Sequence, residues 1–271
     1  MRYIVDHDLH IHSGGSMCSG DPNQTPARIL QYALDEGLTT VALTDHFWDE
    51  LVPMPSGGWG PDFYGSQNWP HITKQLPLPT AQGVRFLFGA EVDMTLDGTL
   101  GISAERLAQM DFLLISISHF HCTDFTISAA DAATAAGKAE ALLRKLEWVL
   151  DRPLPWHKIG LAHLLGQKVS GGDPDLHCEV IRLAQGERLT ALFQKAARLG
   201  VGIELNTATF HFGTDAEREA VTGFYAHAKA CGCRFFFGSD SHSDDRYATH
   251  RGIAQDMADA LELTEADIFR P

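Results

Sequence analysis

Short apolar runs alternate along the chain with segments of helical pattern. Seven runs have the length and composition of buried strands, at residues 3–9, 40–43, 84–88, 112–117, 159–162, 201–205 and 234–237. Helices are predicted over 26–36, 129–151, 187–199, 215–230 and 250–262. Because strand–helix–strand connections are almost always right-handed crossovers, this alternation predicts a parallel sheet, either open or closed into a barrel.

The first predicted helix has recognisable ends. Thr25 can cap it, Pro26 occupies its first position, and Gly37 follows its last turn. The segment 129–151 places Leu142 and Leu146 at helical spacing and reads as one long amphipathic helix.

The least regular part of the chain is the long loop 47–82, which is rich in Pro, Gly and Trp. Loops of this length are usually functional or mobile, so it is either a pocket wall or lid, or a surface excursion packed on its own aromatic residues. Tandem repeats, charge blocks and low-complexity linkers are absent, which predicts a single domain over 1–271.

Every apolar run ends in side chains that can bind a metal or move a proton. In chain order these are His10 and His12, Asp45 and His46, Glu91, His119, His163, Glu204 and Asn206, and Asp240 and His242. In parallel βα proteins the active site lies at the carboxyl ends of the strands, and in a barrel those ends meet at one mouth. Their joint placement favours a closed barrel.

Local spacing supports a metal site. His10 and His12 project to one face of a strand, since side chains alternate with period two. Glu91 follows an apolar stretch, where a buried carboxylate is costly unless a cation neutralises it. Asp240 and His242 repeat the period-two spacing after the last run, where Gly238 allows close backbone approach.

Composition narrows the class of protein. With 271 residues and 44% hydrophobic content, the chain can bury one sizeable core. No run approaches the roughly 18 apolar residues of a membrane span and the first residues lack a signal-peptide pattern, so we expect a soluble, cytoplasmic protein. Five scattered cysteines argue against a disulfide framework. A net charge of -14 argues against duplex nucleic acid as a partner.

Read in order, the motifs DLHIHS, LTDHF, GAEVD, ISISHF, GLAH, IELNT and GSDSH resemble the signature series of the PHP (polymerase and histidinol phosphatase) superfamily. The resemblance runs from residue 8 to residue 242. It implies a distorted, TIM-like (β/α)7 barrel with two or three divalent metal ions, zinc, manganese or iron. It also implies hydrolysis of a small phosphate ester by a metal-bound hydroxide, without a protein nucleophile.

Carried over by motif, His10, His12, Glu91 and Asp240 would hold a first metal ion. Glu91 would bridge to a second ion completed by His119 and His163. His46 and His242 would hold a third. The sequence specifies neither which of the three metals binds nor the oligomeric state.

Two departures from the family pattern bear on this site. Histidinol phosphatases often place a histidine six residues after the second His of the first motif, where this chain has Cys18. Cys18 could bind zinc as a thiolate, Asp21 could replace it as an oxygen ligand, or Cys18 could be a plain loop thiol. After Glu204 the chain reads NTATFHFG, without the family's glycine and basic residue, so the substrate pocket is expected to differ.

Further roles follow from position near the expected mouth. Asp45, Asp240 and His242 are candidates for catalytic proton transfer, although Asp240 is also a metal-ligand candidate. Lys168 is the first candidate for binding the phosphate, with Arg246 and Arg251 as alternatives. His121, two residues after His119, would contact substrate or the outer metal shell.

The leading interpretation is a histidinol-phosphatase-like phosphomonoesterase. A metal-dependent amidohydrolase is an alternative, but His119 and the SDSH ending do not fit its usual ligand pattern. A single-strand nuclease lacks a basic stripe interleaved with aromatics. A non-catalytic metal-binding module would retain the fold after losing the chemistry, yet nearly every ligand position is kept here.

Overall fold

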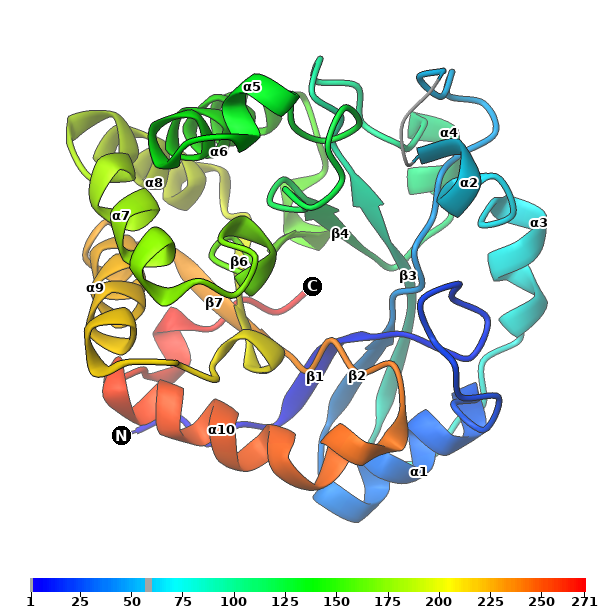
Figure 1. Ribbon diagram of the computed structural model, residues 1–271. Helices are drawn as coiled ribbons and strands as arrows, with labels where there is room; N and C mark the ends of the chain where they lie inside the picture. Colours follow the sequence, from blue (N-terminus) through cyan, green and yellow to red (C-terminus); the bar gives the residue numbers. More distant parts are fainter. Residues whose placement is uncertain (1, 57–59) are drawn as a thin grey trace.

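Seven parallel strands form one curved sheet in the computed structural model, which describes residues 2–56 and 60–271. Strand order follows chain order. The strands are β1 (His7–Ile11), β2 (Thr40–Leu43), β3 (Arg85–Asp93), β4 (Phe112–Ser116), β5 (Ile159–Ala162), β6 (Gly202–Asn206) and β7 (Arg234–Gly238). Helices surround the sheet, which curls into a nearly closed barrel, as predicted (Figure 1).

Closure between β1 and β7 uses backbone bonds at one end and side chains at the other. Near the mouth, Asp240 N donates to His10 O at 2.8 Å and His12 N donates to Ser241 O at 2.9 Å. Further down, His7 Nε2 accepts from Phe237 N at 3.0 Å and Asp8 Oδ1 accepts from Ser239 N at 2.9 Å. Side-chain hydrogen bonds thus replace part of the regular backbone pairing between β1 and β7, so the barrel closes irregularly at this point.

The helices follow the expected alternation, with additions. Their bounds are α1 (Pro26–Glu36), α2 (Gly60–Tyr64), α3 (Trp69–Ile72), α4 (Ala104–Leu107), α5 (Ala129–Ala132), α6 (Ala135–Leu150), α7 (Pro174–Ala184), α8 (Glu187–Leu199), α9 (Asp215–Ala230) and α10 (Tyr247–Ala260). Thr25 caps α1 by accepting from Arg28 N, and Gly37 ends it in the left-handed conformation. Within the described residues, no helix is long and apolar enough to cross a membrane.

Several predicted bounds were wrong for local physical reasons. The first apolar run marks burial rather than strand pairing: Tyr3 and Val5 are buried in the core, but pairing with β2 begins at His7. The helix predicted over 129–151 is broken, because Thr134 accepts from Gly137 N and starts α6. The predicted irregular loop 47–82 contains α2 and α3, and its residues 57–59 lie outside the described part.

An extra residue in β1 turns a histidine into the barrel. Asp8 pairs with Val41 and Ile11 with Leu43, so three steps along β1 match two along β2. This is a β-bulge, which bends a strand and redirects its side chains. Leu9 therefore packs in the apolar interior cluster, while the next side chain, His10, also points inward and contacts Glu204.

Three aromatic rings fill the lower interior of the barrel. Phe112, Phe236 and Phe269 belong to one buried cluster, and their ring centroids lie 5.6–6.3 Å apart. Phe269 comes from the C-terminal segment, which enters the ring of strands (Figure 1) and donates from Phe269 N to Phe235 O at 2.7 Å. A Cβ on Gly160 would lie 2.6 Å from the Phe236 ring and 2.9 Å from the Phe112 ring. Glycine is therefore required at 160 by packing.

Gly160→Ala should lower the free energy of unfolding by about 1–3 kcal/mol, because the added methyl overlaps two fully buried rings. Gly223→Ala is the matched control, since Gly223 lies in α9 with open space around its Cα, and there alanine should stabilise by up to about 1 kcal/mol. Thermal unfolding midpoints at one fixed metal concentration would report both changes. An unchanged midpoint for Gly160→Ala would contradict the packing argument.

Candidate metal centre

Histidines and carboxylates from the strand ends converge on Glu91, whose side chain is 1% exposed. Glu91 Oε2 lies 3.2 Å from His46 Nδ1, 3.4 Å from His10 Nε2 and 3.5 Å from His12 Nε2. Glu91 Oε1 lies 2.8 Å from His163 Nε2 and 3.6 Å from His119 Nε2. Side chains separated by up to 153 positions in sequence therefore surround one carboxylate at the mouth of the barrel.

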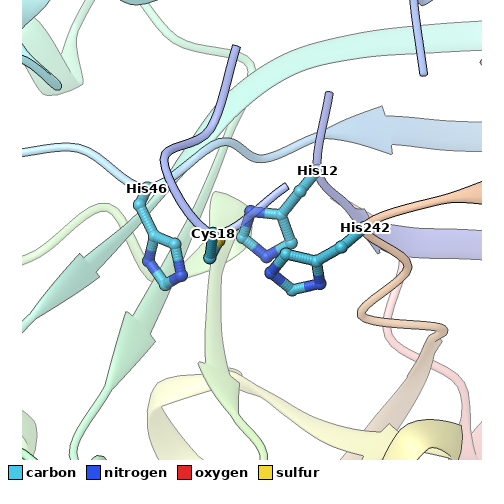
Figure 2. Close-up of side chains that lie close together, drawn as sticks. All are labelled: His12, Cys18, His46 and His242. Carbon is cyan, nitrogen blue, oxygen red and sulfur yellow. The ribbon is translucent and has the colours of Figure 1, made fainter. Parts of the chain in front are cut away.

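Four groups of side chains in the described part bring their ligand atoms within 4.8 Å of one another. They are His10, His12 and Asp240; Glu91, His119 and His163; His10, His163 and Glu204; and His12, Cys18, His46 and His242. Figure 2 shows the last group, in which Cys18 lies between the imidazoles of His46 and His12. The sequence prediction brought together the same residues, apart from Glu204, but placed His12 with the first ion only.

Hydrogen-bond partners behind the imidazoles fix which ring nitrogen carries the proton. His10 Nδ1 lies 2.7 Å from Glu204 Oε1, and His119 Nδ1 lies 2.9 Å from Asp93 Oδ1. Because a carboxylate only accepts, both Nδ1 atoms donate, and both Nε2 atoms keep a lone pair directed at the centre.

His163 is oriented in the same way by a hydroxyl group. Ser118 Oγ donates to His163 O at 2.8 Å and so is left to accept from His163 Nδ1 at 3.1 Å. His163 N donates to Glu204 Oε2 at 2.6 Å, which fixes the backbone of the same residue. The Nε2 lone pair of His163 therefore faces Glu91 Oε1 at 2.8 Å.

The imidazole nitrogens and carboxylate oxygens of the centre lie so close together that their lone pairs repel one another unless a cation lies among them. His10 Nε2 and His12 Nε2 are 3.0 Å apart, and both lie near the carboxylates of Glu91 and Asp240. Neutral imidazole nitrogens and carboxylate oxygens are ligands of divalent zinc, iron and manganese. The residues present therefore fit a divalent-metal centre.

The pKa shifts of Glu91 and His12 favour the forms that bind a metal ion. Burial by itself raises the pKa of Glu91, but the imidazoles of His46, His10 and His119 hold it well below its usual value. Burial, helped by His242 and His46, lowers the pKa of His12 well below its usual value. Glu91 is therefore ionised and His12 is neutral, which are the forms that bind metal. Burial by itself lowers the pKa of His10, but the carboxylates of Glu204, Asp240 and Glu91 raise it well above its usual value, so metal binding there would displace a proton from Nε2.

Backbone conformation at the mouth is specialised. Asp240 and His163 both have positive φ, 52° and 28°, a region that non-glycine residues rarely adopt and that is found at functional sites. Gly238 cannot be replaced without displacing a site residue, since its Cβ would lie 2.0 Å from Glu204 Oε1 and 2.5 Å from His10 Cβ. The close approach expected for Gly238 from the sequence is thus present.

A cavity of about 200 Å³ opens onto these groups. It is lined by Cys18, His46, Phe63, Glu91, His119, His121, Lys168, Asp240 and His242. Phe63 comes from α2, so the irregular segment after β2 contributes a wall to the cavity. A larger hollow of about 500 Å³ against α9 and α10 contains none of these groups.

The structure separates the other predicted site residues into two sets. Lys168 and His121 line the cavity, and Arg246 Nη1 donates to Asp240 O at 3.2 Å beside it. Burial and the neighbouring His119 lower the pKa of His121 to about 4. Arg251 instead donates to Glu36 O at the end of α1 and does not line the cavity.

Asp45 also lies away from the cavity. Its Oδ1 accepts from Ser13 N and its Oδ2 from Ser13 Oγ, both at 2.6 Å, and the side chain is buried. Both oxygens are therefore used to fix the loop after β1, which does not suit the predicted role as a proton donor to substrate. The pKa of Asp45 is raised by burial.

The sequence analysis named Glu204 at a strand end without a role and missed the other residues behind the ligands. Asp93, Ser118 and Glu204 orient His119, His163 and His10, and Tyr64 Oη donates to Asp93 Oδ2 at 2.7 Å. One signal was available, because Asp93 follows Glu91 at strand spacing in GAEVD and must share its face. Ser118 and Tyr64 carried no comparable signal.

Fold and site together define a βα barrel with a histidine- and carboxylate-rich metal centre. The PHP domain family model matches residues 8–208, and the chain belongs to this family, as its motifs predicted. A protein named "Probable phosphatase" from Shewanella oneidensis is 23% identical over 244 residues, which span 89% of this chain and 77% of the relative. A protein of the same name from Shewanella sediminis is equally similar, with 79% of it covered.

Among solved structures, histidinol phosphate phosphatase from Lactococcus lactis, determined with zinc, L-histidinol and phosphate, has a TM-score of 0.59 to this chain. The two are 16% identical, and the match covers 96% of this chain and 94% of the other. At that identity the likeness establishes the shared fold, a TIM-like barrel.

Glu204→Gln should weaken metal binding by about 10–100-fold, because it removes the charge that holds His10 Nδ1 protonated while keeping the shape of the side chain. Glu217→Gln is the matched control: Glu217 forms a buried 2.7 Å pair with His177 outside the centre. Competition with a chromophoric chelator measures both affinities. Equal metal affinity for the two variants would show that Glu204 does not tune the ligands.

Proposed function

We propose that the protein is a metal-dependent phosphoesterase that hydrolyses a small phosphate monoester. The observation that carries the proposal is the fixed direction of the His10, His119 and His163 Nε2 lone pairs toward the carboxylate of Glu91. Membership of the PHP family and the names of its phosphatase relatives support the reaction class. Histidinol phosphate is the first ester to test, since the Lactococcus lactis protein was solved with histidinol and phosphate.

Two groups of residues would hold the ions used in the reaction. His10, His12 and Asp240 would bind one ion with Glu91, and Glu91 would bridge to a second bound by His119 and His163. Zinc, manganese and iron all suit these nitrogen and oxygen ligands. Divalent ions bound there would lower the pKa of an attacking water and neutralise charge on the phosphoryl oxygens.

The remaining cavity residues suit recognition of the ester. Lys168 and His121 lie on the cavity wall and would bind the phosphate oxygens. Phe63 would form the apolar wall facing the alcohol part of the substrate. Because the wall comes from the segment 47–82, we assign to that segment the selection of the leaving group. The chain's net negative charge is no obstacle, since bound cations dominate the local field.

Metal removal should abolish turnover of an aryl phosphate, and re-addition of a divalent ion should restore it. Asp240→Asn should lower kcat/KM by about 100-fold or more, because a metal ligand is worth several kcal/mol in the transition state. Asp244→Asn is the control, since Asp244 is exposed and pairs with Arg28. Steady-state kinetics on both variants, with metal content per chain, test the prediction.

The alternative enzyme classes give different outcomes in the same assay. A metal-loaded protein that leaves a broad panel of phosphate monoesters intact but cleaves amides or lactones would be an amidohydrolase. Cleavage confined to oligonucleotides, with salt-sensitive binding, would indicate a single-strand nuclease. Full metal content with no hydrolysis of any panel would indicate a binding module.

Lys168→Ala should raise KM for the phosphate ester by about 10–100-fold with a smaller change in kcat, because a charged hydrogen bond contributes about 1.5–3 kcal/mol. Arg251→Ala removes a cation that does not line the cavity and should leave KM unchanged. Inhibition by inorganic phosphate should weaken in parallel with KM for Lys168→Ala. Equal KM values for the two variants would remove Lys168 from the phosphate site.

A further inference from the structure

A sulfur atom lies among the imidazoles at the rim of the cavity. Cys18, His46 and His242 line the cavity, and together with His12 they bring one ligand atom each within 4.8 Å of the others (Figure 2). The rings of His12 and His242 are stacked, with centroids 4.2 Å apart, and the His12 and His46 centroids are 4.7 Å apart. The group contains no carboxylate, unlike those built on Glu91 and Asp240.

The loop that carries Cys18 is fixed from several directions. Ser13 is held by Asp45, Met17 N donates to Gln67 Oε1 at 3.0 Å, and Ser19 Oγ donates to His242 O at 2.6 Å. The last bond joins the loop after β1 directly to the loop after β7, which carries His242. Asp21, the alternative oxygen ligand, belongs to none of the four groups of the described part and accepts from Asn23 N at 2.8 Å.

A second observation points to a ligand at this place. His46 is nine-tenths buried, and its Nδ1 makes no hydrogen bond within the described residues; the nearest charged atom is Glu91 Oε2 at 3.2 Å. A buried ring nitrogen without a hydrogen-bonding partner is costly in a folded protein. A cation near His46 would remove that cost.

His12 belongs both to the group with His10 and Asp240 and to the group with Cys18, His46 and His242. The group to which it gives its lone pair decides how many ligands are left for the ion beside Cys18. A neutral imidazole gives its one lone pair to one ion, and His12 Nε2 lies 3.0 Å from His10 Nε2 in the carboxylate-bearing group. With His12 assigned there, Cys18, His46 and His242 remain around the rim position. Three protein ligands and one open position are typical of zinc sites that take water or substrate.

We propose that Cys18, His46 and His242 bind a zinc ion through the Cys18 thiolate, making the rim a sulfur-containing site that selects zinc over manganese. The thiol proton is released to solvent as the S–Zn bond forms. Zinc–sulfur and zinc–nitrogen bonds of about 2.3 and 2.0–2.1 Å hold ligand atoms about 3.3–3.6 Å apart, and the ligand atoms of this group already lie within 4.8 Å of one another.

Selectivity follows from ligand type. Thiolate sulfur is a soft ligand that favours zinc, whereas carboxylate oxygens accept manganese readily. Manganese alone should therefore fill the Glu91 groups and leave the Cys18 group empty. The inference concerns the centre used in the proposed function but does not depend on phosphatase activity, because its tests read metal binding and sulfur chemistry.

Cobalt(II) substitution tests the sulfur ligand directly. The fully loaded wild-type protein should show a thiolate-to-cobalt charge-transfer band in the near ultraviolet, and Cys18→Ser should lose that band while keeping the visible bands of cobalt bound to nitrogen and oxygen ligands. Cys122→Ser is the matched control, since Cys122 is buried next to His121 but belongs to no metal-binding group. It should keep the band. Full cobalt loading without the band, or a band that survives Cys18→Ser, would overturn the proposal.

Alkylation of the wild-type protein gives a second readout that needs no variant. The Cys18 residue is exposed, but burial of its sulfur raises the pKa of the thiol to about 12, so iodoacetamide should modify it slowly in the metal-free protein. Mass spectrometry can follow that residue alone. Zinc should slow the modification by about tenfold or more, and manganese at equal occupancy of the other sites should not. Equal rates with zinc and without metal would show that Cys18 is a free loop thiol, whatever the outcome of the phosphatase assays.

Discussion

The buried carboxylate of Glu91, surrounded by imidazole nitrogens, is the constraint on which the rest of the site depends. A carboxylate at 1% exposure is costly unless positive charge lies beside it. The Nδ1 protons of His10, His119 and His163 are used on Glu204, Asp93 and Ser118, so the Nε2 atoms are the ones left to face the centre. These Nε2 atoms supply the positive charge by taking a second proton, or they bind a divalent cation, which accepts several lone pairs at once.

The barrel supports this arrangement by separating an apolar end from a polar one. Phe112, Phe236 and Phe269 fill the lower interior, and Gly160 leaves room for two of the rings. Above them the interior is occupied by charged and imidazole side chains. The bulge in β1 joins the two zones, because it allows Leu9 to pack below while His10 points into the site. Packing at one end thus fixes the positions of the ligands at the other.

Much of this could be predicted from the sequence, because strand ends in a parallel barrel must converge. The strands at 40–43 and 159–162 and the helix after Thr25 have the predicted bounds, and the histidines and carboxylates that follow the strands do meet, apart from Asp45. What failed depends on tertiary contacts. Pairing decides where β1 begins, and the direction of Ser118 or Tyr64 is set by neighbours far away in sequence.

Asp45 and Asp240 show why residue type and position near the mouth do not decide a role. Both aspartates follow a strand and were candidates for proton transfer. Asp240 has positive φ and turns its carboxylate toward His10 and His12, whereas Asp45 uses both oxygens on Ser13. By holding Ser13, Asp45 fixes the start of the loop that carries Cys18. A carboxylate outside the cavity can therefore shape the site by fixing a loop that lines it.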